Sequence, residues 1–221
     1  MKLVYPEIDA VFHLGEGEFP ACVIENPGLF YHFIDDLYRQ SCGEEGETIL
    51  SVEDCPISIA GNLDLLTNFF PFEINKKTLI NKIISKLEKQ ALSADFFERS
   101  QKLIGQIESL IYDLAFQDDL ELEPARLSIN SLLKASGLAL KEDYSDLSEK
   151  LLVYMDLMVS NGLAAIFVLV NLRSLLNDRE MELFTNCCCQ RGYNILLIDN
   201  KSSSKLSREK RVIIDADLCE I

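Results

Sequence analysis

An acidic run in the middle of the chain has the residue types of a metal site. It consists of Asp118, Asp119, Glu121 and Glu123, with Leu120 and Leu122 interposed. In extended backbone alternate side chains point to the same side. The carboxylates at 119, 121 and 123 would then converge as hard oxygen ligands for Ca²⁺ or Mg²⁺. The alternative is a solvated helix C-terminus and loop, although negative charge there opposes the helix dipole.

A strand–turn–helix near the N-terminus stands where a phosphate-binding loop would lie. Its turn, Glu25-Asn26-Pro27-Gly28-Leu29, has one glycine, no lysine and no hydroxyl residue after a lysine. The strand that would carry a magnesium-binding carboxylate ends at Asn171 instead. Phosphoryl transfer depends on such groups to position and neutralise the phosphates. We therefore expect no triphosphate hydrolysis and a protein that is not an enzyme.

Nucleophilic catalysis has equally little support. His13 and His32 have no recognisable local partner, and there is no GxSxG sequence. The seven cysteines are an odd number, which suits reduced thiols in a cytoplasmic protein. We expect no secretory signal, because Met1-Lys2 is followed by Val4, Tyr5, Pro6, Glu7 and Asp9 in place of an apolar run. The apolar stretch 163–170 is too short to span a membrane.

Basic residues gather in three places of an otherwise acidic chain. The chain has 21 Lys and Arg against 36 Asp and Glu, a net charge of −15 and a pI near 4.5. Such a surface repels nucleic acid as a whole, so DNA binding requires segregated lysines. The alternative for a lysine stripe is an ordinary solvated helix face. The basic groups are Lys76, Lys77, Lys82, Lys86 and Lys89, then Lys134 and Lys141, then Lys201, Lys205, Arg208, Lys210 and Arg211.

Periodicity predicts the elements that position these residues. The start resembles a small β-meander with strands at 3–5, 10–12 and 21–24, a helix from Asn26 or Pro27, and a hairpin at 48–52 and 57–59. From Asn75 the apolar spacing becomes helical, with two long antiparallel helices and shorter ones near 129–133 and 147–158. Buried strands at 165–170 and 194–198 flank a helix from 178 to about 191, and a last strand spans 212–214.

These elements predict an α/β protein in two parts. Residues 1–62 and 160–221 form a discontinuous head with a parallel-sheet core and a degenerate P-loop-like design. Residues 63–159 form an inserted α-helical leg.

In order and spacing the whole pattern resembles the small ring-forming spacer-acquisition (adaptation) proteins of type II-A CRISPR systems. The matching segments are Leu37-Tyr38-Arg39-Gln40, Leu87-Glu88-Lys89-Gln90, Asp119-Leu120-Glu121-Leu122-Glu123, Leu132-Leu133-Lys134-Ala135-Ser136-Gly137, Ile166-Phe167-Val168-Leu169-Val170-Asn171 and Asn194-Ile195-Leu196-Leu197-Ile198.

The resemblance implies a non-catalytic homotetrameric ring that threads linear double-stranded DNA, including its ends, through a lysine-lined hole. It also implies calcium ions that hold the ring's conformation, and CRISPR integrase proteins and the effector nuclease as partners in antiviral defence. Calcium would fall on Asp119, Glu121 and Glu123, with Asp118 as an addition. Lys134 is the leading channel lysine, and the DNA-binding set is Lys134, Lys141, Lys77, Lys82, Lys86, Lys89 and Lys205.

Two other functions remain open from the residues alone. An acidic protein-interaction scaffold is favoured if the carboxylates rather than the lysines carry the contact. The second is a divergent P-loop nucleotide-binding enzyme. A gel shift with short linear duplex separates the DNA-binding ring from the scaffold and from the enzyme, and a nucleotide titration tests the enzyme.

Overall fold

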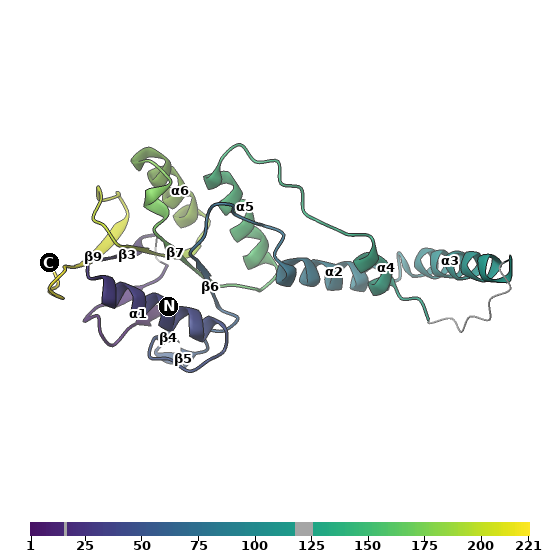
Figure 1. The fold of residues 1–221 in the computed structure, drawn as a ribbon, viewed down its shortest axis with the longest axis horizontal. Helices are drawn as coiled ribbons and strands as arrows, with labels where there is room; N and C mark the ends of the chain where they lie inside the picture. Colours follow the sequence, from purple (N-terminus) through teal and green to yellow (C-terminus); the bar gives the residue numbers. More distant parts are fainter. Residues whose placement is uncertain (16, 118–125) are drawn as a thin grey trace. The chain divides into compact units, whose positions relative to one another are not determined.

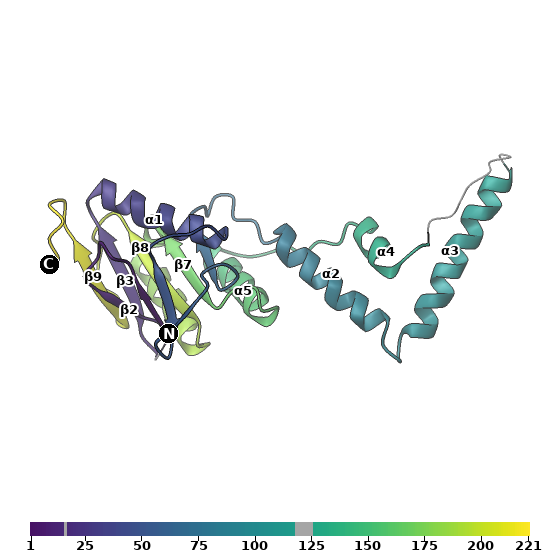
Figure 2. The same ribbon diagram turned by 90° about the horizontal axis from the view of Figure 1, so that it is seen from below.

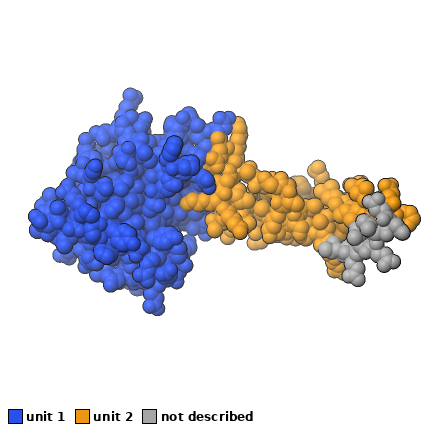
Figure 3. Space-filling model, viewed as in Figure 1, with its two compact units in different colours: residues 1–73, 143–221 blue, residues 74–142 orange. Residues whose placement is uncertain are grey.

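A computed structural model of the chain describes residues 1–15, 17–117 and 126–221. It divides into two compact units (Figure 3). Residues 1–73 and 143–221 form the α/β unit, and residues 74–142 form the helical unit. No helix of the described residues is long and apolar enough to cross a membrane.

The α/β unit is built on a five-stranded sheet in the order β6-β7-β8-β3-β9, and each pair of neighbours is parallel. Its strands are β3 (Phe19–Ile24), β6 (Leu63–Leu66), β7 (Ile166–Val170), β8 (Asn194–Asp199) and β9 (Glu209–Ile214). Strands β3 and β7 are buried at every residue, as the continuous apolar runs of parallel strands predict.

A second sheet of four short antiparallel strands has the order β2-β1-β4-β5. These are β1 (Lys2–Val4), β2 (Val11–His13), β4 (Ile49–Val52) and β5 (Cys55–Ile57). The expected meander is therefore wrong in its third strand. β3 pairs with β8 and β9 in the parallel sheet, because a strand buried on both faces has no place in a sheet exposed on one side.

Helices cover both faces of the parallel sheet (Figure 1). On one side α1 (Pro27–Ser41) and the antiparallel sheet share a core with alternate residues of β3, β7 and β8. On the other side lie α5 (Leu147–Ser160) and α6 (Asp178–Gln190), which bury Met155, Met181 and Phe184. A 3₁₀ turn, η1 (Leu172–Ser174), follows β7. The mixed α/β fold with a parallel sheet is as the sequence predicts.

The helical unit contains α2 (Lys77–Ala91), α3 (Phe97–Gln117) and α4 (Ile129–Ala135). α4 packs against α2, and Asn130 Nδ2 donates to Glu88 Oε2 at 2.7 Å. α2 and α3 diverge from the turn between them (Figure 2), where Ser100 Oγ donates to the Ala91 carbonyl. They do not pack side by side as the antiparallel pair expected from their two apolar stripes.

The boundary between the units differs from the expected insertion of residues 63–159. β6 belongs to the α/β unit because it pairs with β7, with Leu63 opposite Ile166. α5 belongs there as well, since Leu151, Tyr154 and Met155 are fully buried. The Tyr154 hydroxyl donates to Asp64 Oδ2 of β6 at 2.6 Å and ties the two elements together.

All seven cysteines are free thiols. Cys22 and Cys188 are buried in the α/β unit, and burial raises the pKa of the Cys22 thiol to about 12. These two side chains act as small apolar residues of the core.

Candidate functional site

The lysines of α2 fall on two sides of the helix. Lys82, Lys86 and Lys89 have the spacing i, i+4, i+7, so they share one stripe, and all three are exposed. The buried stripe beside them contains Leu79 and Ile84. Lys77, five residues before Lys82, lies on a different side of the helix. The structure thus brings together three of the four α2 lysines expected to bind DNA.

Lys134 and Lys141, the other expected DNA-binding residues of the leg, lie on segments that are held against α2 or its start. Lys134 is exposed in the last turn of α4, which packs on α2. Lys141 is exposed in the segment after α4. That segment is fixed to the start of α2 by Asn75, whose side chain accepts from the Leu140 amide at 2.7 Å and donates to Glu142. All these lysines therefore belong to the helical unit.

The third basic group lies in the α/β unit and is only partly available for a ligand. Lys205 is exposed in the loop between β8 and β9 and lines a cavity of about 570 Å³ with Lys210 and His13. Lys210 forms an ion pair with Glu18 at 3.2 Å. Arg211 is a residue of β9 rather than of the basic loop, and its side chain is only 9% exposed.

Charge is distributed unevenly between the two units. Residues 74–142 contain ten Lys and Arg and ten Asp and Glu, a net charge of zero. The remaining residues contain eleven Lys and Arg and twenty-six Asp and Glu, so the α/β unit accounts for the whole net charge of −15. A polyanion therefore meets no net repulsion from the helical unit itself.

The predicted calcium ligands Asp118, Asp119, Glu121 and Glu123 lie outside the described residues. Within the described ranges, no group of three or more His, Cys, Asp or Glu side chains is arranged to hold a metal ion. The metal site stays a prediction from the sequence.

The turn at the start of α1 is closed by its own residues. Asn26 is the N-cap, and its Oδ1 accepts from the amides of Gly28 and Leu29, both at 3.0 Å. Its Nδ2 donates to the Ala216 carbonyl at 2.9 Å, so the C-terminal segment is anchored at the same point. Two of the amides that a phosphate would bind at a helix N-terminus are thereby already satisfied.

Asn171, at the end of β7, holds the neighbouring strand end. It adopts a left-handed conformation with φ of 56°, and its Oδ1 accepts from the Asn200 amide at 3.0 Å. An amide at this place keeps the backbone in position but supplies no negative charge for a cation.

A buried charge network beside these strand ends is absent from the sequence-based expectations. Arg173 lies 3.1 Å from Asp199 and 2.7 Å from Glu209, and Arg211 Nε donates to Glu209 at 2.5 Å. Both arginines also donate to Ser203 and Ser204, so they hold the loop between β8 and β9 on the sheet.

Burial raises the pKa of Asp199 to about 6, although the charge of Arg173 acts in the opposite direction. Burial also favours a higher pKa for Glu209, but hydrogen bonds from Arg211 and the Leu206 amide and the charge of Arg173 lower it overall. In the sequence this network is indicated only by two acidic residues beside apolar strand residues. Asp199 ends β8, and Glu209 begins β9.

The family model of the CRISPR-associated protein (Cas_Csn2) matches residues 40–218. The chain belongs to the Cas_Csn2 family. This confirms the resemblance to the type II-A CRISPR adaptation proteins that the order of the motifs indicated. The match includes both units, because it runs from the end of α1 through the helices to the segment after β9.

One solved structure supports the mixed α/β fold of the chain. The crystal structure of Stu0660 of Streptococcus thermophilus is similar with a TM-score of 0.60 and 16% identity over 97% of this chain and 74% of that chain. An ABC transporter ATP-binding protein of Pyrococcus furiosus gives 9% identity over 96% of this chain and 94% of that chain. Its TM-score of 0.35 is too low to indicate a common fold. No curated protein sequence matches the chain.

Proposed function

We propose that this Cas_Csn2 protein is a non-catalytic homotetrameric ring that binds double-stranded DNA without sequence preference and takes part in CRISPR spacer acquisition. The observation that carries the proposal is the exposed lysine stripe of α2 in a helical unit with no net charge. Lysines bind phosphates as point charges, so their contacts depend on charge and not on base sequence. Membership of a CRISPR-associated family supports DNA as the polyanion.

The exposed apolar face of α3 supports assembly of several copies. Leu103, Leu110 and Leu114 have the spacing i, i+7, i+11 on one side of the helix and are 49%, 57% and 55% exposed. Leaving such a stripe in water is unfavourable, and pairing with another subunit removes it from water. A closed ring of four copies would multiply each lysine contact by four.

Calcium would act on the acidic run of the helical unit. Four of the ten carboxylates between residues 74 and 142 are Asp118, Asp119, Glu121 and Glu123. Carboxylates are the ligands that Ca²⁺ prefers, and neutralising them would give the helical unit a net positive charge. The same ion would relieve repulsion between acidic residues at subunit contacts.

The closed turn of α1 supports a role without nucleotide chemistry. Asn26 occupies the amides of Gly28 and Leu29, and the turn has no lysine for a β- or γ-phosphate. This is the observation against the divergent P-loop enzyme. We infer that the protein works in the cytoplasm beside the CRISPR integrase proteins and the effector nuclease, as a DNA clamp and not as a catalyst.

Charge reversal at one lysine of the α2 stripe and at Lys134 of α4 tests DNA binding. Lys86→Glu and Lys134→Glu should weaken binding of linear duplex, and the slope of log affinity against log salt should fall by roughly one unit for each phosphate that the variant no longer neutralises. Lys102→Glu on α3 is the matched control, because it is an exposed lysine of the same unit with the same change of charge. An equal decrease of affinity in all three variants would contradict a defined DNA-binding face.

Topology tests the ring. A closed ring loads on linear plasmid and not on a relaxed closed circle, whereas an open basic surface binds both. The two DNA forms are compared at the same salt and calcium concentrations. Equal affinity for the linear and circular forms would overturn threading, even if DNA binding itself were strong.

A further inference from the structure

The solvent-facing side of α1 presents two tyrosines above a shallow apolar groove. Tyr31 and Tyr38, spaced i, i+7, are 64% and 59% exposed. A hollow of about 230 Å³ between α1 and β6 is lined by both tyrosines together with Ile34, Asp35, Leu65 and Thr67. Tyrosine is enriched where proteins bind each other, because its ring is apolar and its hydroxyl can still bond to water.

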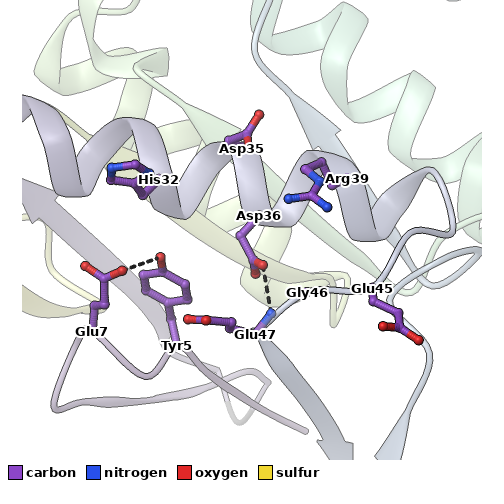
Figure 4. A pocket seen from close by; sticks show the side chains of 9 residues that line it. All are labelled: Tyr5, Glu7, His32, Asp35, Asp36, Arg39, Glu45, Gly46 and Glu47. Carbon is purple, nitrogen blue, oxygen red and sulfur yellow. Dashed lines mark hydrogen bonds between the residues drawn. The ribbon is translucent and has the colours of Figure 1, made fainter.

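An acidic cavity of about 450 Å³ opens on the adjacent side of the same helix (Figure 4). Five carboxylates and one arginine belong to its lining, which consists of Tyr5, Glu7, His32, Asp35, Asp36, Arg39, Glu45, Gly46 and Glu47. Arg39 is already paired with Glu44 at 2.9 Å. The cavity therefore has an excess of negative charge.

The wall of this cavity is fixed in place by Asp36. Its carboxylate accepts from the amides of Glu47 and Thr48 at 2.8 and 2.9 Å and from the Thr48 hydroxyl at 2.5 Å. Burial favours a higher pKa for Asp36, but these hydrogen bonds outweigh it and lower the pKa. The loop after α1 is thus held against the helix, and the cavity is a preformed feature of the surface.

Asp35 lines both hollows and joins them into one surface, which we call the α1 surface: Tyr31, Ile34, Tyr38 and Leu65 on one side and Glu7, Asp36 and Glu47 on the other. It lies in the unit that carries the whole net charge of −15. The carboxylates repel phosphates, so DNA is a poor occupant.

We propose that the α1 surface docks a partner protein through a basic segment with apolar side chains. Lysine or arginine side chains of the segment would enter the acidic cavity, and apolar side chains would lie against Tyr31 and Tyr38. Arginine suits both halves, because its guanidinium pairs with carboxylates and stacks on aromatic rings. The proposal is independent of the DNA-binding lysines, since none of them lines either hollow of the α1 surface.

The test is fluorescence anisotropy with a labelled synthetic peptide of alternating Arg and Leu residues, used with the full-length protein. Two further peptides replace Arg by Glu or Leu by Ser. We expect the Arg-Leu peptide to bind and both replacements to weaken binding about tenfold or more, because charge and apolar contacts both contribute. Failure of the Arg-Leu peptide to bind, or equal binding of the Arg-Ser peptide, would overturn the proposal.

Variants distinguish the α1 surface from general attraction of a cation to an acidic protein. The double variant Tyr31→Ser/Asp35→Asn should bind the peptide about tenfold more weakly. The matched control Leu183→Ser/Asp217→Asn makes comparable changes at exposed positions outside the α1 surface, and should bind as the parent does. Equal affinities of the two double variants would overturn the proposal. Tyr38→Ser, at a well-exposed position, repeats the test if the double variant unfolds.

Two measurements separate this proposal from the proposed function. The double variant should keep the parent's mass in light scattering and its affinity for linear duplex, since it changes no lysine and no residue of α3. A fall in mass would make the α1 surface a contact between copies of this chain and would overturn its assignment to a partner protein. Weaker DNA binding with unchanged mass would assign the surface to DNA and overturn the proposal equally.

Discussion

Removing the charge of Glu209 should destabilise the α/β unit strongly. The Glu209 side chain is fully buried and has three partners that donate or pair with it: Arg173 Nη2 at 2.7 Å, Arg211 at 2.5 and 3.0 Å, and the Leu206 amide at 2.8 Å. Glu209→Gln keeps the shape of the side chain. It replaces an accepting oxygen by an NH₂ group and leaves two buried guanidinium groups without their shared carboxylate.

The size of the destabilisation follows from the two arginine charges that stay buried in the variant. Breaking a buried ion pair by removing one partner costs about 3–5 kcal/mol, because the remaining charge is buried without compensation. Asp199, which lies 3.1 Å from Arg173, is a single carboxylate beside two buried guanidinium groups and offsets only part of this loss. We expect the variant to lose about 3 kcal/mol or more in the free energy of unfolding of the α/β unit.

The measurement is urea unfolding at neutral pH, followed by circular dichroism. Glu18→Gln is the matched control, because it removes a carboxylate from an ion pair with Lys210 in which both side chains are more than half exposed. Exposed pairs contribute about 0–1 kcal/mol. If Glu209→Gln costs no more than Glu18→Gln, the network is not a structural anchor and the reasoning from burial is refuted.

Three further predictions concern single residues of the α/β unit. Asp199 has a pKa of about 6, above its value in the unfolded chain, so its contribution to stability is fully present below about pH 4 and is lost as the pH rises through about 6. Asp199→Asn should therefore become more stable relative to the parent between pH 4 and pH 7, in thermal melts across that range; a constant difference would contradict the shift. Gly46→Ala should cost about 1–3 kcal/mol, because an added Cβ would meet Asp36 Oδ1 and the Gln40 side chain; an unchanged melting temperature would contradict this close approach. Asn26→Ala should cost about 1 kcal/mol in urea unfolding by removing the N-cap of α1, and the variant should still not hydrolyse ATP; turnover in either protein would contradict the closed turn.

Strands and helices with strong periodicity could be predicted from the sequence, and β6 could not. β7 has a continuous apolar run and forms at 166–170, close to the expected bounds. α6 has a clear N-cap residue and forms at 178–190, also close to the expected bounds. β6 has four residues, one of them Asp64, and reads as a loop. Asp64 is tolerated because Tyr154, ninety residues later, donates to it, an interaction that no local pattern records.

The candidate site shows the same division between local and long-range information. The i, i+4, i+7 spacing of Lys82, Lys86 and Lys89 is local, and the structure places them on one face of α2 as expected. Sequence alone groups Arg211 with the basic loop because it follows Lys210. Its burial depends on Glu209 and on the carbonyls of Ser203 and Ser204, which the fold of the loop brings to it. The positions of charges along the chain cannot separate a ligand-binding arginine from a structural one.

Calcium and DNA should bind cooperatively if the acidic run holds the metal. Without the carboxylates of Asp118, Asp119, Glu121 and Glu123, residues 74–142 contain ten basic and six acidic residues and would attract a polyanion. When these four carboxylates are not neutralised, residues 74–142 have no net charge. Linear duplex should therefore bind more tightly in calcium than in chelator, and by linkage saturating duplex should raise calcium affinity by the same factor. Isothermal titration of calcium into protein with and without duplex measures this factor. Calcium affinity that is the same in both titrations would mean that the ion does not act through the charge of the helical unit.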